Sequence, residues 1–230
     1  MFCFENDSGD ACLPFFAKMS CAIYILRYLW YNQAIKSLNF KGARSMDGKK
    51  RCKWCNLKNG LYVEYHDKEW CVPRFDDRYL YEMLILESFQ AGLSWECVLN
   101  KRESFRAAYD GFDIDRVVLY GEAKVGELLL RDTSIIRNRR KIESSINNSR
   151  IFKSIVSEYG SFYGYLRTFF DGKTIYEVGK TTNDLSDAIS RDLQGRGMRF
   201  VGSVIIYSYL QAIGVIYSHD EDCFLYRSDG

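Results

Sequence analysis

The sequence predicts an all-α domain, on three observations. Apolar residues recur at helical spacing from residue 76 onward. Alternation of apolar and polar residues between turn dipeptides, which would indicate strands, is scarce. The 230 residues include only two prolines, Pro14 and Pro73, and proline interrupts helices. A chain of this length is long enough for one substantial hydrophobic core.

The first 45 residues differ from the rest, since they mix Cys, Phe and Tyr without a sustained period. We interpret residues 1–45 as an N-terminal extension that is poorly ordered or results from a mis-set start. The alternative is a small extra helix around residues 20–38, packed on the domain. Met46 then opens a polar run. The functional domain is therefore expected to comprise residues 46–230.

The expected helices follow in order. Asp76 or Asp77 can cap a first helix whose apolar positions include Leu80, Leu84 and Ala91. Asp113 precedes a second apolar run and can cap it in the same way. Further helices are expected over residues 122–131, 138–157, 160–170, 184–195 and 201–216.

A carboxylate stands on the apolar face of the first helix. Positions 80, 84, 87 and 91 share one side, so Glu87 is expected to point with the leucines toward the core. Glu82 is expected to sit in water. A buried carboxylate has a disturbed pKa unless partners compensate its charge. Glu87 is either a functional group or a structural one that caps an amide or pairs with an arginine.

Aromatic residues flank this carboxylate in the sequence. Gly92 is expected to end the helix and bring Trp95 just beyond Glu87, while Trp54 and Tyr65 occur earlier. Aromatic faces attract a flat cationic ring, and a carboxylate accepts hydrogen bonds from its N–H groups. The alternative interpretation is that these rings belong to the core.

Cysteines and histidines form two candidate halves of a metal site. His219 and Cys223 are four positions apart, and any two of Cys52, Cys55 and His66 could complete a Cys2His2 set. Such ligands suit zinc, and a closed four-ligand site is structural. The metal would join the beginning of the domain to its end. The alternative is coincidental spacing with buried thiols.

Four cations occur within five residues between two helical runs: Arg137, Arg139, Arg140 and Lys141. Free backbone N–H groups at such a turn, together with these cations, bind phosphate without reading sequence. A solvated charge run is the alternative. The formal net charge of the whole chain is only +2, so DNA binding would depend on a local patch of this kind.

Together these motifs resemble the 3-methyladenine DNA glycosylase I family of the helix-hairpin-helix superfamily. The similarity runs in order from residue 51 to about residue 226. The matching stretches are Arg51-Cys52-Lys53-Trp54, Tyr65-His66-Asp67-Lys68-Glu69-Trp70, Leu86-Glu87, Gln90-Ala91-Gly92-Leu93-Ser94-Trp95, Lys101-Arg102-Glu103, Ile135-Ile136-Arg137, Phe200-Val201-Gly202, Tyr207-Ser208, Gln211-Ala212 and His219-x3-Cys223.

The resemblance implies a helix-hairpin-helix DNA glycosylase fold with a structural zinc site that joins the N- and C-terminal segments of the domain. One Zn2+ ion per chain would be held by Cys52, His66, His219 and Cys223, so that Cys52 is chosen over Cys55.

The resemblance also implies the residues of a base-binding site. Glu87 would be the catalytic polar residue that hydrogen-bonds the damaged adenine. Tyr65 and Trp95 would stack on the base, and Trp54 would line the pocket. Leu93 would fill the gap that the everted nucleotide leaves in the duplex.

The activity implied is that of a monofunctional DNA glycosylase. It would evert and hydrolytically excise N3-methyladenine from alkylated double-stranded DNA and so initiate base excision repair. Arg137, Arg139 and Lys141 would contact the DNA. We expect a cytoplasmic monomer without a membrane partner. Two alternatives remain: a catalytically silent, zinc-stabilised module that binds damaged DNA, and a helical metalloprotein without a DNA role.

Three positions depart from the family pattern. Ser134 and Arg140 stand where the family usually has glycine in the hairpin, and Cys71 replaces a common glycine after Trp70. Glycine at the hairpin positions would permit a positive φ and close phosphate approach. These replacements leave the hairpin geometry and the DNA affinity open.

Overall fold

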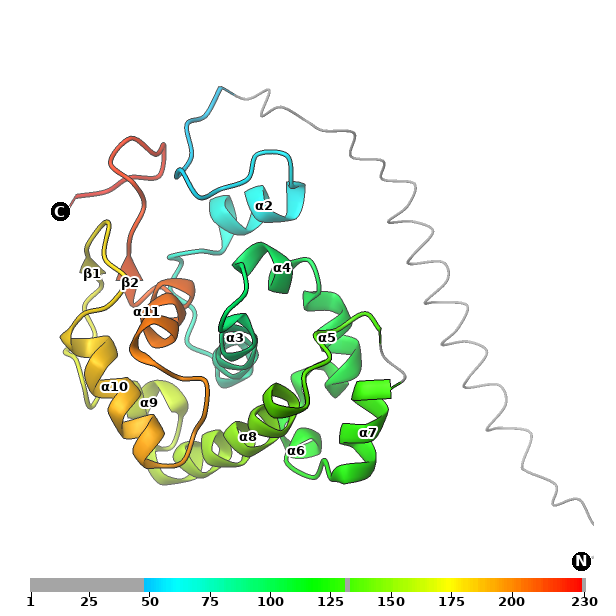
Figure 1. Cartoon of the computed structure of the whole chain (residues 1–230). Coiled ribbons are helices and arrows are strands. Elements are labelled where there is room, and N and C mark those ends of the chain that lie inside the picture. Colours follow the sequence, from blue (N-terminus) through cyan, green and yellow to red (C-terminus); the bar gives the residue numbers. More distant parts are fainter. Residues whose placement is uncertain (1–47, 131–132, 229–230) are drawn as a thin grey trace, which may run out of the picture. The chain divides into compact units, whose positions relative to one another are not determined.

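Residues 48–130 and 133–228 are described by the structure, a computed structural model. The 1–45 extension and its alternative helix lie outside these residues. Among the described residues helices predominate (Figure 1). They are α2 (Gly60–Lys68), α3 (Asp77–Gln90), α4 (Trp95–Leu99), α5 (Arg102–Ala108), the 3-10 helix η1 (Asp110–Phe112), α6 (Ile114–Val117), α7 (Glu122–Leu130), α8 (Arg139–Tyr159), α9 (Phe162–Leu166), α10 (Asp184–Gly195) and α11 (Ser203–Ala212).

The predicted helices are present, with two shortened. The helix expected over 160–170 is only the five-residue α9, because Gly160 ends α8 with a φ of 79° and Ser161 caps the new start. The helix expected to reach residue 216 ends at Ala212, where a turn at Gly214 with a φ of 77° leads into a strand. Helices α2, α4 and α5 were not predicted from the sequence.

One short parallel strand pair corrects the all-α expectation. Strand β1 (Ile175–Tyr176) pairs with β2 (Ile216–Tyr217) in register Ile175 to Ile216. Two-residue strands carry too little alternation to be seen in a sequence. The fold is therefore mostly helical with a minimal sheet. No helix within residues 48–130 and 133–228 has the length and apolar character needed to cross a bilayer.

Helix α3 lies at the centre of the described part and packs against α4, α8, α9 and α11 (Figure 1). The Asp76 side chain accepts a hydrogen bond from the Tyr79 N–H and begins the helix. Every residue from Tyr79 to Phe89 is buried. A central helix of this kind has no face in water.

This burial explains why the prediction for Glu82 is wrong. Glu82 is only 7% exposed. Its Oε1 lies 2.6 Å from Arg102 Nε and 2.8 Å from Arg106 Nη2. Packing on every side of α3 removed the solvent face that the helical period implied, and arginines from α5 compensate the buried charge.

The two ends of the described chain meet beside α2. Asn59 caps α2 by accepting hydrogen bonds from the N–H groups of its first turn. The Phe224 N–H donates to Lys50 O at 2.8 Å, and the Lys53 N–H donates to Asp220 Oδ2 at 2.8 Å. These contacts bring the C-terminal segment against the residues that precede α2.

Candidate functional site

Four side chains from the two ends form one buried cluster: Cys52, His66, His219 and Cys223. Their ligand atoms all lie within 4.8 Å of one another. Sulfur-to-nitrogen distances are 3.4 Å from Cys52 to His219, 3.5 Å from Cys223 to His66 and 3.6 Å from Cys223 to His219. A tetrahedral zinc with bonds of about 2.3 Å to sulfur and about 2.0 Å to nitrogen places these atoms roughly 3.5 Å apart. The cluster therefore fits a zinc ion.

Further hydrogen bonds orient these side chains. His66 Nδ1 lies 2.8 Å from Asp67 Oδ1, and Arg51 holds the same carboxylate through two hydrogen bonds of 2.8 and 2.6 Å. The Asp220 N–H donates to Cys52 Sγ at 3.3 Å. A carboxylate behind a histidine sets the ring orientation, as it does in metal sites. Burial lowers the pKa of His219 to about 4, so the ring is neutral at pH 7 as a metal ligand requires.

The structure brings together the set that the resemblance implied, and Cys55 lies outside it. The Cys55 thiol faces Tyr62 O at 3.9 Å, and burial raises the pKa of this thiol to about 11. The spacing of the cysteines alone could not make this distinction.

Glu87 lies near the C-terminal end of α3 and is 2% exposed. Its Oε2 is buried and has no hydrogen-bond partner among the described residues. Burial raises the pKa of this carboxyl well above its usual range. A carboxylate left without a partner inside a protein is costly and indicates a functional site.

Two more buried polar atoms without a partner lie close by in the chain. They are Gln90 Oε1, one turn after Glu87, and Trp95 Nε1 at the start of α4. Native proteins leave few such atoms, and each suggests an absent ligand or water. At the C-terminal end of α3, the Glu87 and Gln90 oxygens can accept hydrogen bonds from a polar ligand, and the Trp95 indole N–H can donate one. Gln90 was not identified from the sequence as a site residue.

Two tyrosines of α2 lie close enough to Glu87 to be affected by its charge. The rings of Tyr65 and Trp95 are 5.4 Å apart between centroids and tilted by 49°. Burial, and then the negative charge of Glu87, raise the pKa of Tyr65 well above its usual range. Burial, followed by the charges of Glu96, Cys55 and, last, Glu87, raises the pKa of Tyr62 to about 12. Tyr62 was missed in the sequence, although it lies one helical turn before Tyr65 on α2.

Trp54 connects this aromatic group to the metal cluster. Its ring contacts Tyr62 edge-on at 5.2 Å, Trp70 at 4.7 Å and His66 at 5.3 Å. Trp54 therefore packs against Tyr62 and His66 of α2 and against Trp70, which follows that helix. A metal that fixes His66 also fixes the position of Trp54 and, through it, of Tyr62.

The turn after α3 exposes an apolar side chain. Gly92 has a φ of 76°, a conformation that glycine adopts without strain, and it ends the helix. Leu93 follows and is 40% exposed. Ser94 then caps α4 by accepting a hydrogen bond from the Cys97 N–H. The end of the long helix α3 and the start of the short helix α4 thus hold a protruding leucine within a tight turn.

The cations of the basic run take three different environments. Arg137 is exposed and Arg139 is ion-paired with Glu122 at 2.7 Å and with Glu143 at 3.0 Å. Lys141, expected at DNA phosphates, points inward instead. Its Nζ donates to Phe89 O at 2.7 Å and to Ala91 O at 2.6 Å, at the C-terminal end of α3.

The departures from glycine have different consequences. Neither Ser134 nor Arg140 has a positive φ, so neither position needs the freedom of glycine. Cys71 does adopt a φ of 63°, a strained conformation for a residue with a Cβ. The hairpin backbone therefore accommodates both replacements.

Comparisons with known proteins agree with this arrangement. The family described as methyladenine glycosylase matches residues 54–226. DNA-3-methyladenine glycosylase 1 of Escherichia coli (strain K12) is 39% identical over 183 residues, which cover 76% of this chain and 96% of that protein. DNA-3-methyladenine glycosylase of Haemophilus influenzae is 32% identical over 179 residues, which cover 75% and 96%.

Solved structures show the same similarity. A crystal structure of 3-methyladenine DNA glycosylase I superposes with a TM-score of 0.73 at 40% identity, covering 77% of this chain and all of that chain. A variant of 3-methyladenine DNA glycosylase I in complex with 3-methyladenine gives a TM-score of 0.69 at 31% identity, covering 73% and 92%. The chain belongs to the methyladenine glycosylase family and is a glycosylase enzyme.

Proposed function

We propose that this protein everts N3-methyladenine from double-stranded DNA and excises it by hydrolysis. The observation that carries the proposal is the unpartnered Glu87 carboxylate buried beside Tyr65 and Trp95. N3-methylation makes adenine a flat cation, which aromatic faces and a carboxylate attract. A neutral base offers no charge to compensate the buried carboxylate, so the site favours the damaged base.

The reaction uses the charge that the methyl group introduces. Chemistry on a base in a duplex requires that the base first leave the stack. In this proposal Tyr65 and Trp95 stack on the everted base, and Glu87 accepts hydrogen bonds from its N–H groups. Leu93 fills the gap that the everted nucleotide leaves in the duplex. The glycosidic bond then breaks with its electron pair passing to the base, which becomes neutral. Water adds to the anomeric carbon and loses a proton to solvent, leaving an abasic site.

We further propose that the Cys2His2 cluster holds one structural zinc ion. Support comes from the sulfur-to-nitrogen distances, the burial of all four side chains and the Asp67 carboxylate behind His66. Four protein ligands leave no open position, so the ion supplies stability rather than chemistry. The residues around it tie the segment before α2 to the segment after β2, which in the chain are far apart.

Base release from methylated duplex DNA tests the proposed function. Purified full-length protein should liberate 3-methyladenine, detected by chromatography, and leave abasic sites cleavable by alkali. An unmethylated duplex of the same sequence is the control. Tight binding to an abasic duplex without any base release would favour a silent binding module. Absence of salt-dependent DNA binding would favour a purely structural protein.

Metal analysis tests the zinc proposal. Fresh full-length protein should contain one zinc per chain, and His219→Ala should lose it together with a fall in melting temperature, because metal binding and folding are coupled. Cys55→Ser is the matched control, since this thiol lies outside the cluster, and it should retain the zinc. Fresh protein without metal would contradict the proposal.

A further inference from the structure

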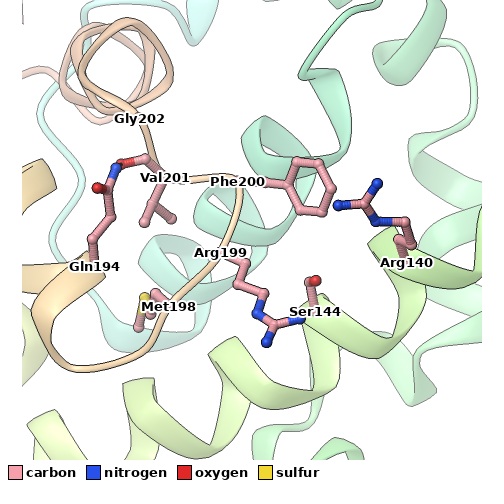
Figure 2. A pocket seen from close by; sticks show the side chains of 8 residues that line it. All are labelled: Arg140, Ser144, Gln194, Met198, Arg199, Phe200, Val201 and Gly202. Atoms are coloured by element: carbon pink, nitrogen blue, oxygen red, sulfur yellow. The ribbon is translucent and has the colours of Figure 1, made fainter.

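We propose that a pocket bordered by Arg140 on α8 and Arg199 in the α10–α11 loop, separate from the base-binding site, binds one backbone phosphate of the DNA. The proposal rests on the proposed function and adds residues to its DNA interface. The pocket encloses a cavity of about 420 Å³. Figure 2 shows the Arg140 guanidinium directed toward the Phe200 ring and the Arg199 side chain extending toward Ser144.

The charge of this pocket is positive and uncompensated. Arg140 and Arg199 are exposed, and neither forms an ion pair with a described residue. No acidic side chain lines the cavity. The contrast with Arg139 is direct, because that neighbour of Arg140 is held by two glutamates. Two guanidinium groups that line one cavity with no acidic side chain beside them favour an anionic ligand.

A hydroxyl group in the same cavity lacks a partner. Ser144 is only 4% exposed and lines the pocket, one helical turn after Arg140. Its hydroxyl makes no hydrogen bond to a described residue, whereas those of Ser145 and Ser149 donate to backbone carbonyls. Because Ser144 lines the same pocket as the two arginines, its hydroxyl supplies a third donor for a phosphate oxygen.

The loop that carries Arg199 is held rigidly. Asn148, fully buried on α8, donates to Arg199 O at 2.8 Å and accepts from the Arg199 N–H at 2.9 Å. Phe200 has a φ of 56°, a costly conformation for an aromatic residue that the surroundings must enforce. The Val201 carbonyl is fixed by a hydrogen bond of 2.8 Å from Ser190. Arg199 is therefore presented from a preorganised backbone.

The pocket adjoins the base-binding end of α3. Lys141 Nζ lies 5.9 Å from the centre of the Phe200 ring and donates to Phe89 and Ala91 at the end of α3. The turn that exposes Leu93 follows immediately. A duplex whose gap receives Leu93 would pass its backbone close to Arg140 and Arg199. The pocket therefore fits a phosphodiester group flanking the everted nucleotide.

The experiment measures salt-dependent binding of the full-length chain to a fluorescent duplex containing a tetrahydrofuran abasic-site analogue. Each phosphate contact adds about 0.9 to the slope of log affinity against log salt concentration. R140Q/R199Q should lower that slope by about 0.9, the value for one phosphate. Ser144→Ala should weaken binding about threefold with little change of slope, since a neutral hydrogen bond is lost.

Arg167→Gln is the matched control, because Arg167 is exposed, lies outside the pocket and follows α9 at the opposite end of α3. It should keep the wild-type slope. Binding of free 3-methyladenine should be unchanged in R140Q/R199Q. A double variant with the wild-type slope would overturn this inference, even while wild-type protein releases 3-methyladenine. Wild-type protein that binds the duplex with the expected slope but releases no base would instead contradict the proposed function alone.

Discussion

Two glutamates on the buried helix α3 differ in what surrounds them. Near its middle, Glu82 is paired with Arg102 and Arg106. Near its end, Glu87 is still less exposed and keeps Oε2 without a partner. Burial alone therefore does not mark a functional carboxylate. A structural carboxylate such as Glu82 is paired with cationic side chains of the fold. A functional one such as Glu87 has no such partner, and a bound ligand supplies the opposite charge.

The largest effect should follow from Glu87→Gln. The variant keeps the shape of the side chain but cannot ionise to become the negative counter-charge of the cationic base. Release of 3-methyladenine should fall about 100-fold or more, in the range of a lost electrostatic contact in an active site. Single-turnover base release measures this. Full activity would remove Glu87 from its role, and Glu82 would then need to be reconsidered.

The next largest effect is a loss of stability when Glu82, the paired glutamate of α3, loses one of its arginines. Arg102→Met removes a partner of Glu82 and also of Glu69, which Arg102 Nη1 contacts at 2.7 Å. Glu82 would keep only Arg106, and the partly buried Glu69 would lose this arginine, so the free energy of unfolding should fall by about 3–5 kcal/mol. Urea denaturation measures the loss. The exposed Arg116→Gln is the control and should change stability by less than about 1 kcal/mol. If the Arg102→Met protein were as stable as the wild type, the pairing of Glu82 with Arg102 would contribute nothing to the free energy of unfolding.

A third effect tests the link between the hairpin and α3. Lys141→Met removes two charge-assisted hydrogen bonds to the last carbonyls of α3, which should loosen the Leu93 turn. We expect base release to fall by a factor corresponding to about 1.5–3 kcal/mol. The salt dependence of DNA binding should stay at the wild-type value. In Arg137→Gln, by contrast, the slope should fall by about 0.9. A reduced slope for Lys141→Met would place its ammonium on the DNA after all.

The smallest effect is a pH dependence of stability. Burial raises the pKa of folded Glu87 above its ordinary value of 4.5. The folded state therefore holds this proton at pH values where the unfolded state has lost it, so the contribution of Glu87 to stability falls as pH rises above about 4.5. Glu87→Gln lacks this titration. Its melting temperature relative to the wild type should rise between pH 4 and pH 8, and a constant difference would contradict the raised pKa.

Much of the architecture was predictable from residue patterns. The helical period located α3, α7, α8 and α10 within a few residues, because amphipathic or apolar repeats are local. The family resemblance chose Cys52 over Cys55, and the structure gathers that set. The strand pair escaped prediction because two residues make no pattern.

The environments of charged residues were less predictable. A helical wheel assigns Glu82 to solvent, yet neighbours cover every side of α3. Adjacent cations on α8 diverge in the same way: Arg139 is ion-paired, Arg140 lines a pocket and Lys141 is buried. Successive helical residues point about 100° apart, so a run of charges in the sequence is not one patch in space.

By itself the sequence determined the longer helices and the family, since these depend on local periodicity and ordered motifs. Only the tertiary structure decided which charges are compensated. Glu87 differs from Glu82 through contacts made by distant segments, and Ser144 and Arg199 line one pocket although they are 55 positions apart in the chain. Burial and electrostatic pairing are properties of packed neighbours, which no single stretch of sequence contains.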